Sequence, residues 1–210
     1  MISRTSRDLL YVYAQRHGDR TAVVDSQGAF TYRDLLDASS RVATGLLAGR
    51  EDLHEDRVAF LITPGFQWVA VQWGIWRAGG VAVPLPLTST KPELEYFIDD
   101  TAASTLSFDA STAAVLGPIA AARGIRASPC ENLLASQAAG LPEVTSERRA
   151  MILYTSGTTS RPKGVVTTHA NITAQIVSLV EAWEWSADDI ILLCLPLHHV
   201  HASFISNHKC

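Results

Sequence analysis

A chain of 210 residues is long enough for one large domain or two small ones with a buried core. Its net charge of −4 comes from scattered charges with no basic stripe, so we expect no nucleic-acid partner. The three cysteines lie far apart without a C-x-x-C pair, which argues against a disulfide framework and fits a reducing compartment.

Targeting signals are not evident either. The first residues lack the apolar core of a signal peptide, and Asp8 comes too early for a typical transit peptide. Residues 58–87 are the most apolar region, but proline, glycine and polar residues interrupt them, whereas a membrane span needs about 20 apolar residues. We expect a cytoplasmic protein without a membrane span that acts on small molecules, with a mitochondrial location as the alternative.

The first quarter of the chain predicts a helix, a hairpin and a long helix. Residues 5–15 have helical apolar spacing, and two short strands, 21–25 and one near Phe30, flank a turn at residues 26–28. Thr31 followed by Asp34 is typical of a helix N-terminus, and apolar residues continue that helix to Gly49.

The middle of the chain predicts a strand-helix-strand unit. Residues 57–62 and 81–85 are apolar runs expected of buried strands, and the helix between them, 66–78, carries three core tryptophans. This spacing is typical of a right-handed crossover in a parallel sheet. Three further elements and one irregular segment are predicted next: a helix at 91–99, a weak strand at 104–108, a helix at 111–122 split by Gly117–Pro118, and a linker and surface segment at 128–149.

The last part predicts an apolar strand at 150–154, a loop, a returning strand at 165–168, a helix at 171–183 and a buried strand at 190–195. The fold class is therefore α/β, with a mainly parallel sheet covered by helices. If residues 190–195 are the unpaired edge of that sheet, we expect self-association through them.

The segment YTSGTTSRPKG, Tyr154–Gly164, is rich in hydroxyl groups and follows a predicted buried strand. Its backbone N–H groups and hydroxyls suit phosphate oxygens, and Lys163 and Arg161 add positive charge. A Walker loop would need glycine where Pro162 stands and a hydroxyl where Gly164 stands, so that motif is excluded. A flexible Ser/Thr/Gly linker is the other alternative, disfavoured by the apolar runs on both sides.

The string YTSGTTSRPKGV followed by THANI resembles the phosphate-binding signature of the adenylate-forming superfamily, which includes acyl-CoA synthetases, luciferases and peptide-synthetase adenylation domains. DRTAVVD, FTYRDLL, WVAVQWGIWRAGGVAVPL and LPLHHVHA resemble other segments of that family. The histidines and the segments GGVAVPL and LEYFIDD are most similar to the malonyl-CoA synthetase branch, and Ser160 departs from the family's usual glycine.

The resemblance implies a two-step ligation. A carboxylate attacks the α-phosphorus of ATP to give an acyl adenylate and pyrophosphate, and the thiol of coenzyme A then displaces AMP to give a thioester. The implied acid is a small dicarboxylate such as malonate, or a fatty acid, and Mg²⁺ would bridge the phosphates. Lys163 would be catalytic, and the nucleotide would be held by Thr155, Ser156, Gly157, Thr158, Thr159 and Lys163.

Three histidines, His198, His199 and His201, follow the last predicted strand. No carboxylate lies nearby and no i, i+4 helical spacing exists, so we predict no protein metal site. In an extended chain His199 and His201 share a face, which favours pocket-lining donors for the substrate. Histidines merely hydrogen-bonded at a strand end are an equally good interpretation.

Later signatures of the superfamily are absent from these 210 residues: a Tyr-Gly-x-Thr-Glu segment for Mg²⁺, a Thr-Gly-Asp for the ribose, and a mobile C-terminal domain with a catalytic lysine. We assign residues 1–202 to the N-terminal portion of an AMP-dependent synthetase/ligase domain and 203–210 to a tail outside the family. We therefore expect a catalytically incomplete, truncated ligase. The alternatives are a non-catalytic nucleotide- or partner-binding module and, less favoured, a phosphotransferase that uses the loop alone.

Overall fold

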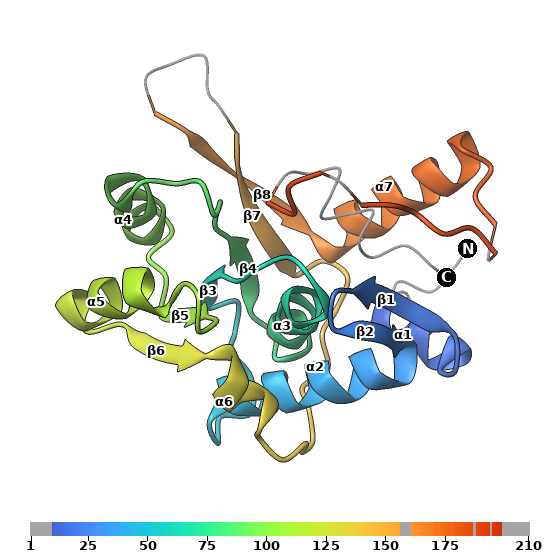
Figure 1. Cartoon of the computed structure of the whole chain (residues 1–210), viewed down its shortest axis with the longest axis horizontal. Coiled ribbons are helices and arrows are strands. Elements are labelled where there is room, and N and C mark those ends of the chain that lie inside the picture. Colours follow the sequence, from blue (N-terminus) through green and yellow to red (C-terminus); the bar gives the residue numbers. More distant parts are fainter. Residues whose placement is uncertain (1–9, 156–160, 187, 194, 199–210) are drawn as a thin grey trace.

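The computed structural model of the chain describes residues 10–155, 161–186, 188–193 and 195–198. Figure 1 shows a central sheet with helices on both faces and a small hairpin, β1–β2, beside it. The elements in chain order are α1 (Leu10–Ala14), η2 (Gln15–His17), β1 (Thr21–Asp25), β2 (Gly28–Thr31), α2 (Tyr32–Leu47), β3 (Arg57–Leu61), α3 (Phe66–Arg77), β4 (Val81–Pro84), α4 (Lys91–Asp100), β5 (Thr105–Phe108), α5 (Ala113–Arg123), β6 (Arg126–Pro129), α6 (Cys130–Leu134), β7 (Arg149–Thr155), β8 (Lys163–Thr168) and α7 (His169–Ala182).

The central sheet has six strands in the order β6-β5-β3-β4-β7-β8. All neighbouring pairs are parallel except β7–β8, which forms an antiparallel hairpin. The predicted α/β class with a mainly parallel sheet is therefore confirmed. The predicted β1–β2 hairpin also forms, and it makes a separate two-stranded sheet.

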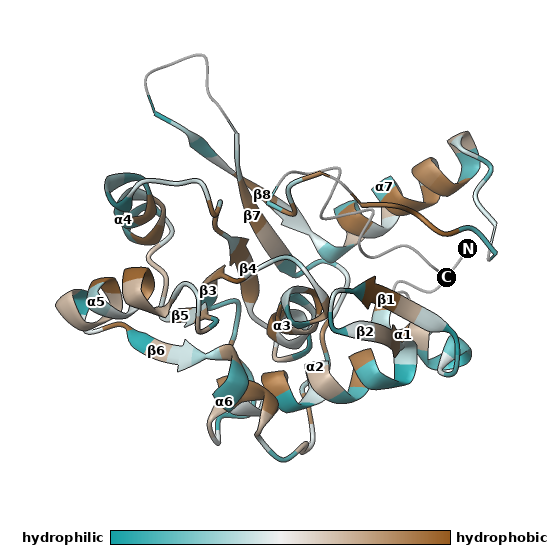
Figure 2. Cartoon of the chain, viewed as in Figure 1, coloured by the Kyte–Doolittle hydropathy of each residue, from teal (hydrophilic) through white to brown (hydrophobic). Residues whose placement is uncertain are grey.

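Two apolar clusters cover the two faces of the sheet. Side chains alternate along β3, so Val58 and Phe60 enter the cluster with α2 and α3, whereas Ala59 and Leu61 enter the cluster with α4 and α5. Figure 2 shows the hydrophobic residues concentrated in β4 and β7 at the centre of the sheet. The buried strands thus read as apolar runs because both faces are covered.

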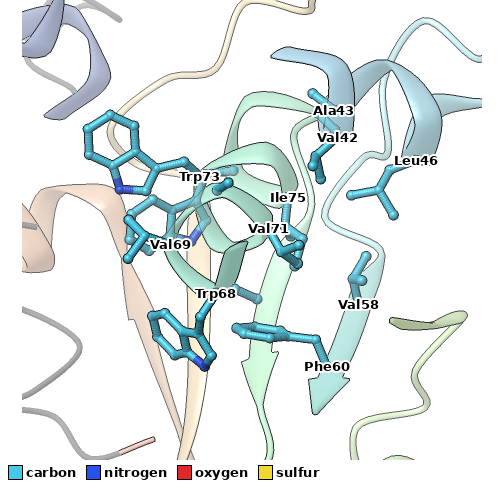
Figure 3. Close-up of a cluster of buried hydrophobic side chains, with 14 of the residues drawn as sticks. Val42, Ala43, Leu46, Val58, Phe60, Trp68, Val69, Val71, Trp73 and Ile75 are labelled. Atoms are coloured by element: carbon cyan, nitrogen blue, oxygen red, sulfur yellow. The ribbon is translucent and has the colours of Figure 1, made fainter. Parts of the chain in front are cut away.

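Helix α3 lies in the centre of the first cluster, as Figure 3 shows. The predicted core tryptophans are 3%, 1% and 1% exposed: Trp68, Trp73 and Trp76. A Cβ on Gly74 would collide with Val42 of α2, so this glycine permits the close approach of the two helices. The indole Nε1 of Trp76 donates a buried hydrogen bond of 2.7 Å to the carbonyl of Ala150, which joins α3 to β7.

The predicted start of the long helix is confirmed as a capping box. The amide of Asp34 donates to Thr31 Oγ1 at 3.2 Å, and the amide of Thr31 donates to Asp34 Oδ2 at 2.8 Å. These bonds satisfy backbone donors that the first helical turn leaves without partners.

Three expectations need correction. The helix predicted as split at Gly117–Pro118 is continuous, because Leu116, Ile119 and Ala120 are buried on one side and hold α5 across the proline. The segment at 128–149 is not only linker: β6 pairs in parallel with β5, and α6 buries Cys130 and Leu133.

The third correction concerns residues 190–195, predicted as a buried strand. Their described residues form no strand, and Ile190 and Leu192 are 83% and 89% exposed. Among the described strands β8, not residues 190–195, ends the sheet beside β7. No helix in the described ranges is both long and apolar enough to cross a membrane.

Strand β8 ends the described sheet and exposes two valine side chains, Val165 and Val166, so we propose that this edge mediates the expected self-association. We expect Val166→Lys to reduce oligomer formation, measured by gel filtration with light scattering, because a charged side chain disfavours edge-to-edge pairing. Val177→Lys on α7 is the matched control, since both valines are 49% exposed. A monomeric wild type, or equal oligomer content in wild type and Val166→Lys, would contradict the proposal.

The start of α3 depends on a carboxylate from another element. Asp25 Oδ2 accepts a 2.8 Å hydrogen bond from the Phe66 amide, while Asp25 Oδ1 accepts from the Gln27 amide at 2.8 Å. A Cβ on Gly65 would lie only 2.8 Å from Asp25 Oδ2, and the φ of Gly65 is +156°, so glycine is required there.

We expect Asp25→Ala to lower the free energy of unfolding by about 1–2 kcal/mol, because it removes the cap of α3. The measurement is urea unfolding followed by circular dichroism. Asp37→Ala is the control, because Asp37 makes an exposed i, i+4 ion pair with Arg41 at 2.9 Å, and the loss of this pair should cost less than about 0.5 kcal/mol. Equal losses in the two variants would refute the capping role of Asp25.

Candidate functional site

The described ends of the hydroxyl-rich segment, Tyr154–Thr155 and residues 161–164, lie at the end of the β7–β8 hairpin stem, which projects beyond the sheet near α4 (Figure 1). Thr155 pairs with Lys163 at the last rung of the ladder, and Thr155 Oγ1 lies 3.5 Å from the Lys163 carbonyl oxygen. The structure therefore brings two predicted nucleotide-binding residues together. The remaining four lie outside the described residues: Ser156, Gly157, Thr158 and Thr159.

The hairpin forms here because its strands fit each other tightly. Along β7 the buried Ala150, Met151 and Leu153 anchor the strand in the core. Gly164 on β8 lies opposite Tyr154, and a Cβ there would lie 3.0 Å from Ile152 Cγ2 and 3.4 Å from Tyr154 Cζ. The glycine of the Pro-Lys-Gly sequence thus leaves room for a cross-strand aromatic ring, a pairing known to stabilise strand glycines.

Helix α4 holds the stem of the hairpin through two tyrosines. Tyr154 Oη donates to Asp100 Oδ2 at 2.6 Å, and the Tyr154 ring packs against Phe97 with centroids 4.3 Å apart. Tyr96 Oη donates to the carbonyl of Pro162 at 3.0 Å. Burial, followed by the nearby Asp100 carboxylate, raises the pKa of Tyr154, so its phenol stays a neutral donor.

Two positive side chains, Arg161 and Lys163, lie on the β8 side of the hairpin stem, and both residues are exposed. The guanidinium carbon of Arg161 lies 5.7 Å from the centroid of the Tyr96 ring. Within the described residues, neither cation makes an ion pair, and no group of three or more His, Cys, Asp or Glu side chains is placed to hold a metal. This donor set fits an anion such as phosphate and does not fit a metal ion.

The THANI sequence has a structural role where β8 ends. Thr168 and Asn171 form a capping box, with the Asn171 amide donating to Thr168 Oγ1 at 3.2 Å and the Thr168 amide donating to Asn171 Oδ1 at 3.0 Å. His169 between them is 5% exposed, and its ring meets the Trp76 ring edge-on at 5.7 Å. Its Nε2 has no hydrogen-bond partner within the part of the chain that the structure describes.

The predicted substrate histidines, His199 and His201, lie outside the described residues, as does the predicted tail at 203–210. Their role stays a prediction. His198 is described and is partly buried.

Two surface hollows of about 600 and 540 Å³ border the start of α3, and both are lined by Asp25, Pro64 and Gly65. Thr155 and Lys163 are absent from their described linings, so these hollows are separate from the hairpin stem.

A protein-family profile described as "AMP-binding enzyme" matches residues 10–206. The chain belongs to this family. Malonate–CoA ligase ACSF3 of Bos taurus, a mitochondrial protein, is 40% identical over 203 residues, which are 91% of this chain and 35% of that ligase. The Homo sapiens ligase of the same name is 38% identical over 214 residues, which cover 95% of this chain and 37% of the human ligase.

Solved structures agree with the family. Apo MatB from Rhodopseudomonas palustris superimposes with a TM-score of 0.82 at 29% identity, covering 95% of this chain and 42% of MatB. ATP-bound MatB from the same organism superimposes with a TM-score of 0.82 at 28% identity and the same coverage of both chains. The resemblance to the adenylate-forming superfamily and to its malonyl-CoA synthetase branch is therefore confirmed. The chain corresponds to an N-terminal part of these relatives and spans well under half of their length.

The tyrosines and Asp100 that hold the hairpin were not among the residues singled out from the sequence. Tyr96 and Asp100 lie four residues apart on α4, and this spacing places them on one helix face. That pattern alone does not show which strand the face contacts.

The buried His169 predicts an acid-sensitive fold. Burial lowers the pKa of His169 from 6.5 to about 4, assisted by Arg148 and opposed by Glu55. Above pH 6.5 the ring is neutral in the folded and in the unfolded chain, so its protonation does not reduce the free energy of unfolding. As the pH falls from 6.5 towards 4, the unfolded chain binds a proton that the folded chain excludes, so stability is lost.

Wild type should lose unfolding free energy between pH 7 and 4. We expect this loss to be roughly 3 kcal/mol smaller in His169→Leu. The measurement is urea unfolding at a series of pH values. His54→Asn, at an exposed histidine, is the control and should follow wild type. Parallel pH curves for wild type and His169→Leu would rule out this origin of the acid sensitivity.

Proposed function

We propose that this chain carries the ATP-binding segment of a ligase that activates a carboxylic acid, first as an acyl adenylate and then as a coenzyme A thioester. One observation carries the proposal. In a chain of the AMP-binding enzyme family, Thr155 and Lys163 pair with each other at the end of the hairpin stem, and Arg161 precedes Lys163 by two residues. A hydroxyl and two cations at one place suit the phosphates of a nucleotide.

The preferred acid in this proposal is a small dicarboxylate such as malonate, with a fatty acid as the alternative. Support comes from the relatives at 38–40% identity, which are named malonate–CoA ligases. His199 and His201 would face the second carboxylate of such an acid. Binding of ATP is supported by the similarity to ATP-bound MatB.

The residues of the hairpin would act on the phosphates of ATP. When pyrophosphate leaves, negative charge grows on the β- and γ-phosphates, and Lys163 and Arg161 would stabilise it. Loss of one preorganised donor of this type typically costs about 10²–10³ in rate. Because the donor set here is cationic, Mg²⁺ would enter as a complex with ATP and not through a protein site on this hairpin.

We also propose that the 210 residues alone bind nucleotide without completing the ligation, since the expected ribose and Mg²⁺ signatures are absent from their sequence. A nucleotide- or partner-binding module without catalysis is the alternative function. The incomplete ligase and the nucleotide-binding module both predict ATP binding. They differ in whether this sequence takes part in a ligase.

We expect Lys163→Ala to weaken binding of Mg·ATP by roughly 10- to 100-fold, because it removes one charged hydrogen-bond donor to phosphate. Isothermal titration calorimetry measures the affinity. Lys91→Ala is the matched control, since Lys91 is exposed on α4 and lies 3.9 Å from Glu95, its i, i+4 partner. Its affinity for Mg·ATP should equal that of wild type.

A second assay measures pyrophosphate released from ATP in the presence of malonate. Nucleotide binding without release agrees with the incomplete ligase and with the non-catalytic nucleotide-binding module, and robust release would contradict both. A wild-type chain that binds no ATP would contradict the nucleotide-binding function in either form.

A further inference from the structure

Tyr96 contacts two consecutive residues of the hairpin stem with two different parts of its side chain. The hydroxyl donates to the carbonyl of Pro162 at 3.0 Å, and the ring lies under the guanidinium of Arg161 at 5.7 Å. Pro162 is followed directly by Lys163, the first residue of β8, which pairs with Thr155 at the end of β7. One side chain of α4 thus contacts the two residues that precede Lys163.

The bond to Pro162 extends the hydrogen bonding of the hairpin past its ladder. The register of β7 with β8 ends at Thr155 and Lys163, so the carbonyl of Pro162 lies outside the regular strand pairing. Proline cannot donate a backbone hydrogen bond, which leaves its carbonyl as the only backbone group available to fix its position. Tyr96 supplies the donor for that group.

The contact with Arg161 differs from the other arginine contact of the same helix. Arg123 is neutralised by α4 through Asp99 at 2.6 Å and Glu95 at 3.6 Å. Arg161 instead lies over an aromatic ring, and such a contact orients a guanidinium by its face without using its N–H donors. Within the part of the chain that the structure describes, its N–H donors therefore remain available for an anion.

A second tyrosine supports the same stem from the neighbouring strand. Tyr154 is fixed by Asp100 at 2.6 Å and by the ring of Phe97, and its own ring lies 6.1 Å from that of Tyr96. Tyr96, Phe97 and Asp100 all belong to α4, so one helix contacts both strands of the hairpin.

We propose that Tyr96 is a positioning residue that holds Arg161 and Lys163 in place for the phosphates of ATP, with Tyr154 and Asp100 keeping the hairpin against α4. This inference rests on the proposed function. It assigns to α4 a role in nucleotide affinity, although α4 itself supplies no phosphate ligand. A cluster that only stabilised the fold would affect unfolding but not the affinity of a folded chain.

The test measures binding of Mg·ATP and of inorganic pyrophosphate to the full chain by calorimetry. We expect Tyr96→Phe, which loses only the hydroxyl, to weaken both affinities about two- to tenfold, the value of one neutral hydrogen bond. Tyr96→Leu, which also loses the ring, should weaken them about tenfold or more. Tyr13→Leu is the control, because the Arg16 guanidinium lies 5.5 Å from the ring of Tyr13 in a similar contact, away from the hairpin. Its affinities should equal those of wild type.

A double-mutant cycle separates positioning from general stability. If Tyr96 acts through Arg161, Tyr96→Leu should weaken the affinity less in the Arg161→Ala variant than in wild type. Fully additive losses, or a folded Tyr96→Leu that binds like wild type while Lys163→Ala binds weakly, would overturn the inference. Tyr96→Phe keeps the test valid if Tyr96→Leu fails to fold.

Failure of the proposed function gives a different result, since the wild-type chain would then bind no ATP. Hydrogen exchange of residues 161–166 would decide the positioning role independently. Faster exchange confined to that peptide in Tyr96→Leu supports the inference, and unchanged exchange refutes it.

Discussion

The buried hydrogen bond from the Trp76 indole to the Ala150 carbonyl, 2.7 Å long, fixes the root of the hairpin that carries the candidate site. The register of β4 with β7 consists of one pair, Ala82 with Met151, so pairing with the parallel strands alone gives the β7–β8 hairpin little support. The guanidinium of Arg148, just before β7, adds bonds to Asp52 at 2.7 and 2.9 Å. These contacts set the direction in which β7 leaves the core. The position of Thr155 at its far end follows from that direction.

The hairpin is therefore supported at two separate points. The α3 side holds its root within the core, and α4 holds its stem through Tyr96 and Tyr154. A loop that binds a charged ligand needs donors whose positions are fixed before the ligand arrives, because ordering them afterwards costs affinity. Contacts with two helices on opposite faces of the sheet hold the described stem of the hairpin, which includes Thr155 and Lys163.

Local signals in the sequence predicted most of the fold. The capping box at Thr31, the apolar runs of β3 and β4, and the helical spacing of the tryptophans are patterns of neighbouring residues, and each is confirmed. The missed elements depend on distant partners. Strand β6 has the polar sequence RASP, and only its pairing with β5 makes it a strand. Residues 190–195 show the reverse case, since an apolar run becomes a buried strand only when other elements cover it.

The same distinction applies to the site. Its chemistry stays a prediction, made from a local pattern of high specificity: a hydroxyl-rich segment with Lys163 after a buried strand. The support of the hairpin stem could not be predicted, because Tyr96 and Pro162 are 66 positions apart and their contact exists only after the sheet has formed. Sequence patterns thus indicated which groups would meet a phosphate, and the structure adds what holds them.

The close fit between Gly164 and Ile152 also restricts which residues position 164 can accept during evolution. A Cβ gained there would lie 3.0 Å from Ile152 Cγ2, so the isoleucine side chain would have to shift, whereas the 3.4 Å to Tyr154 Cζ is ordinary van der Waals contact. Descendants of this chain should therefore keep glycine at 164 while Ile152 is present, or gain a side chain there together with a smaller residue at 152.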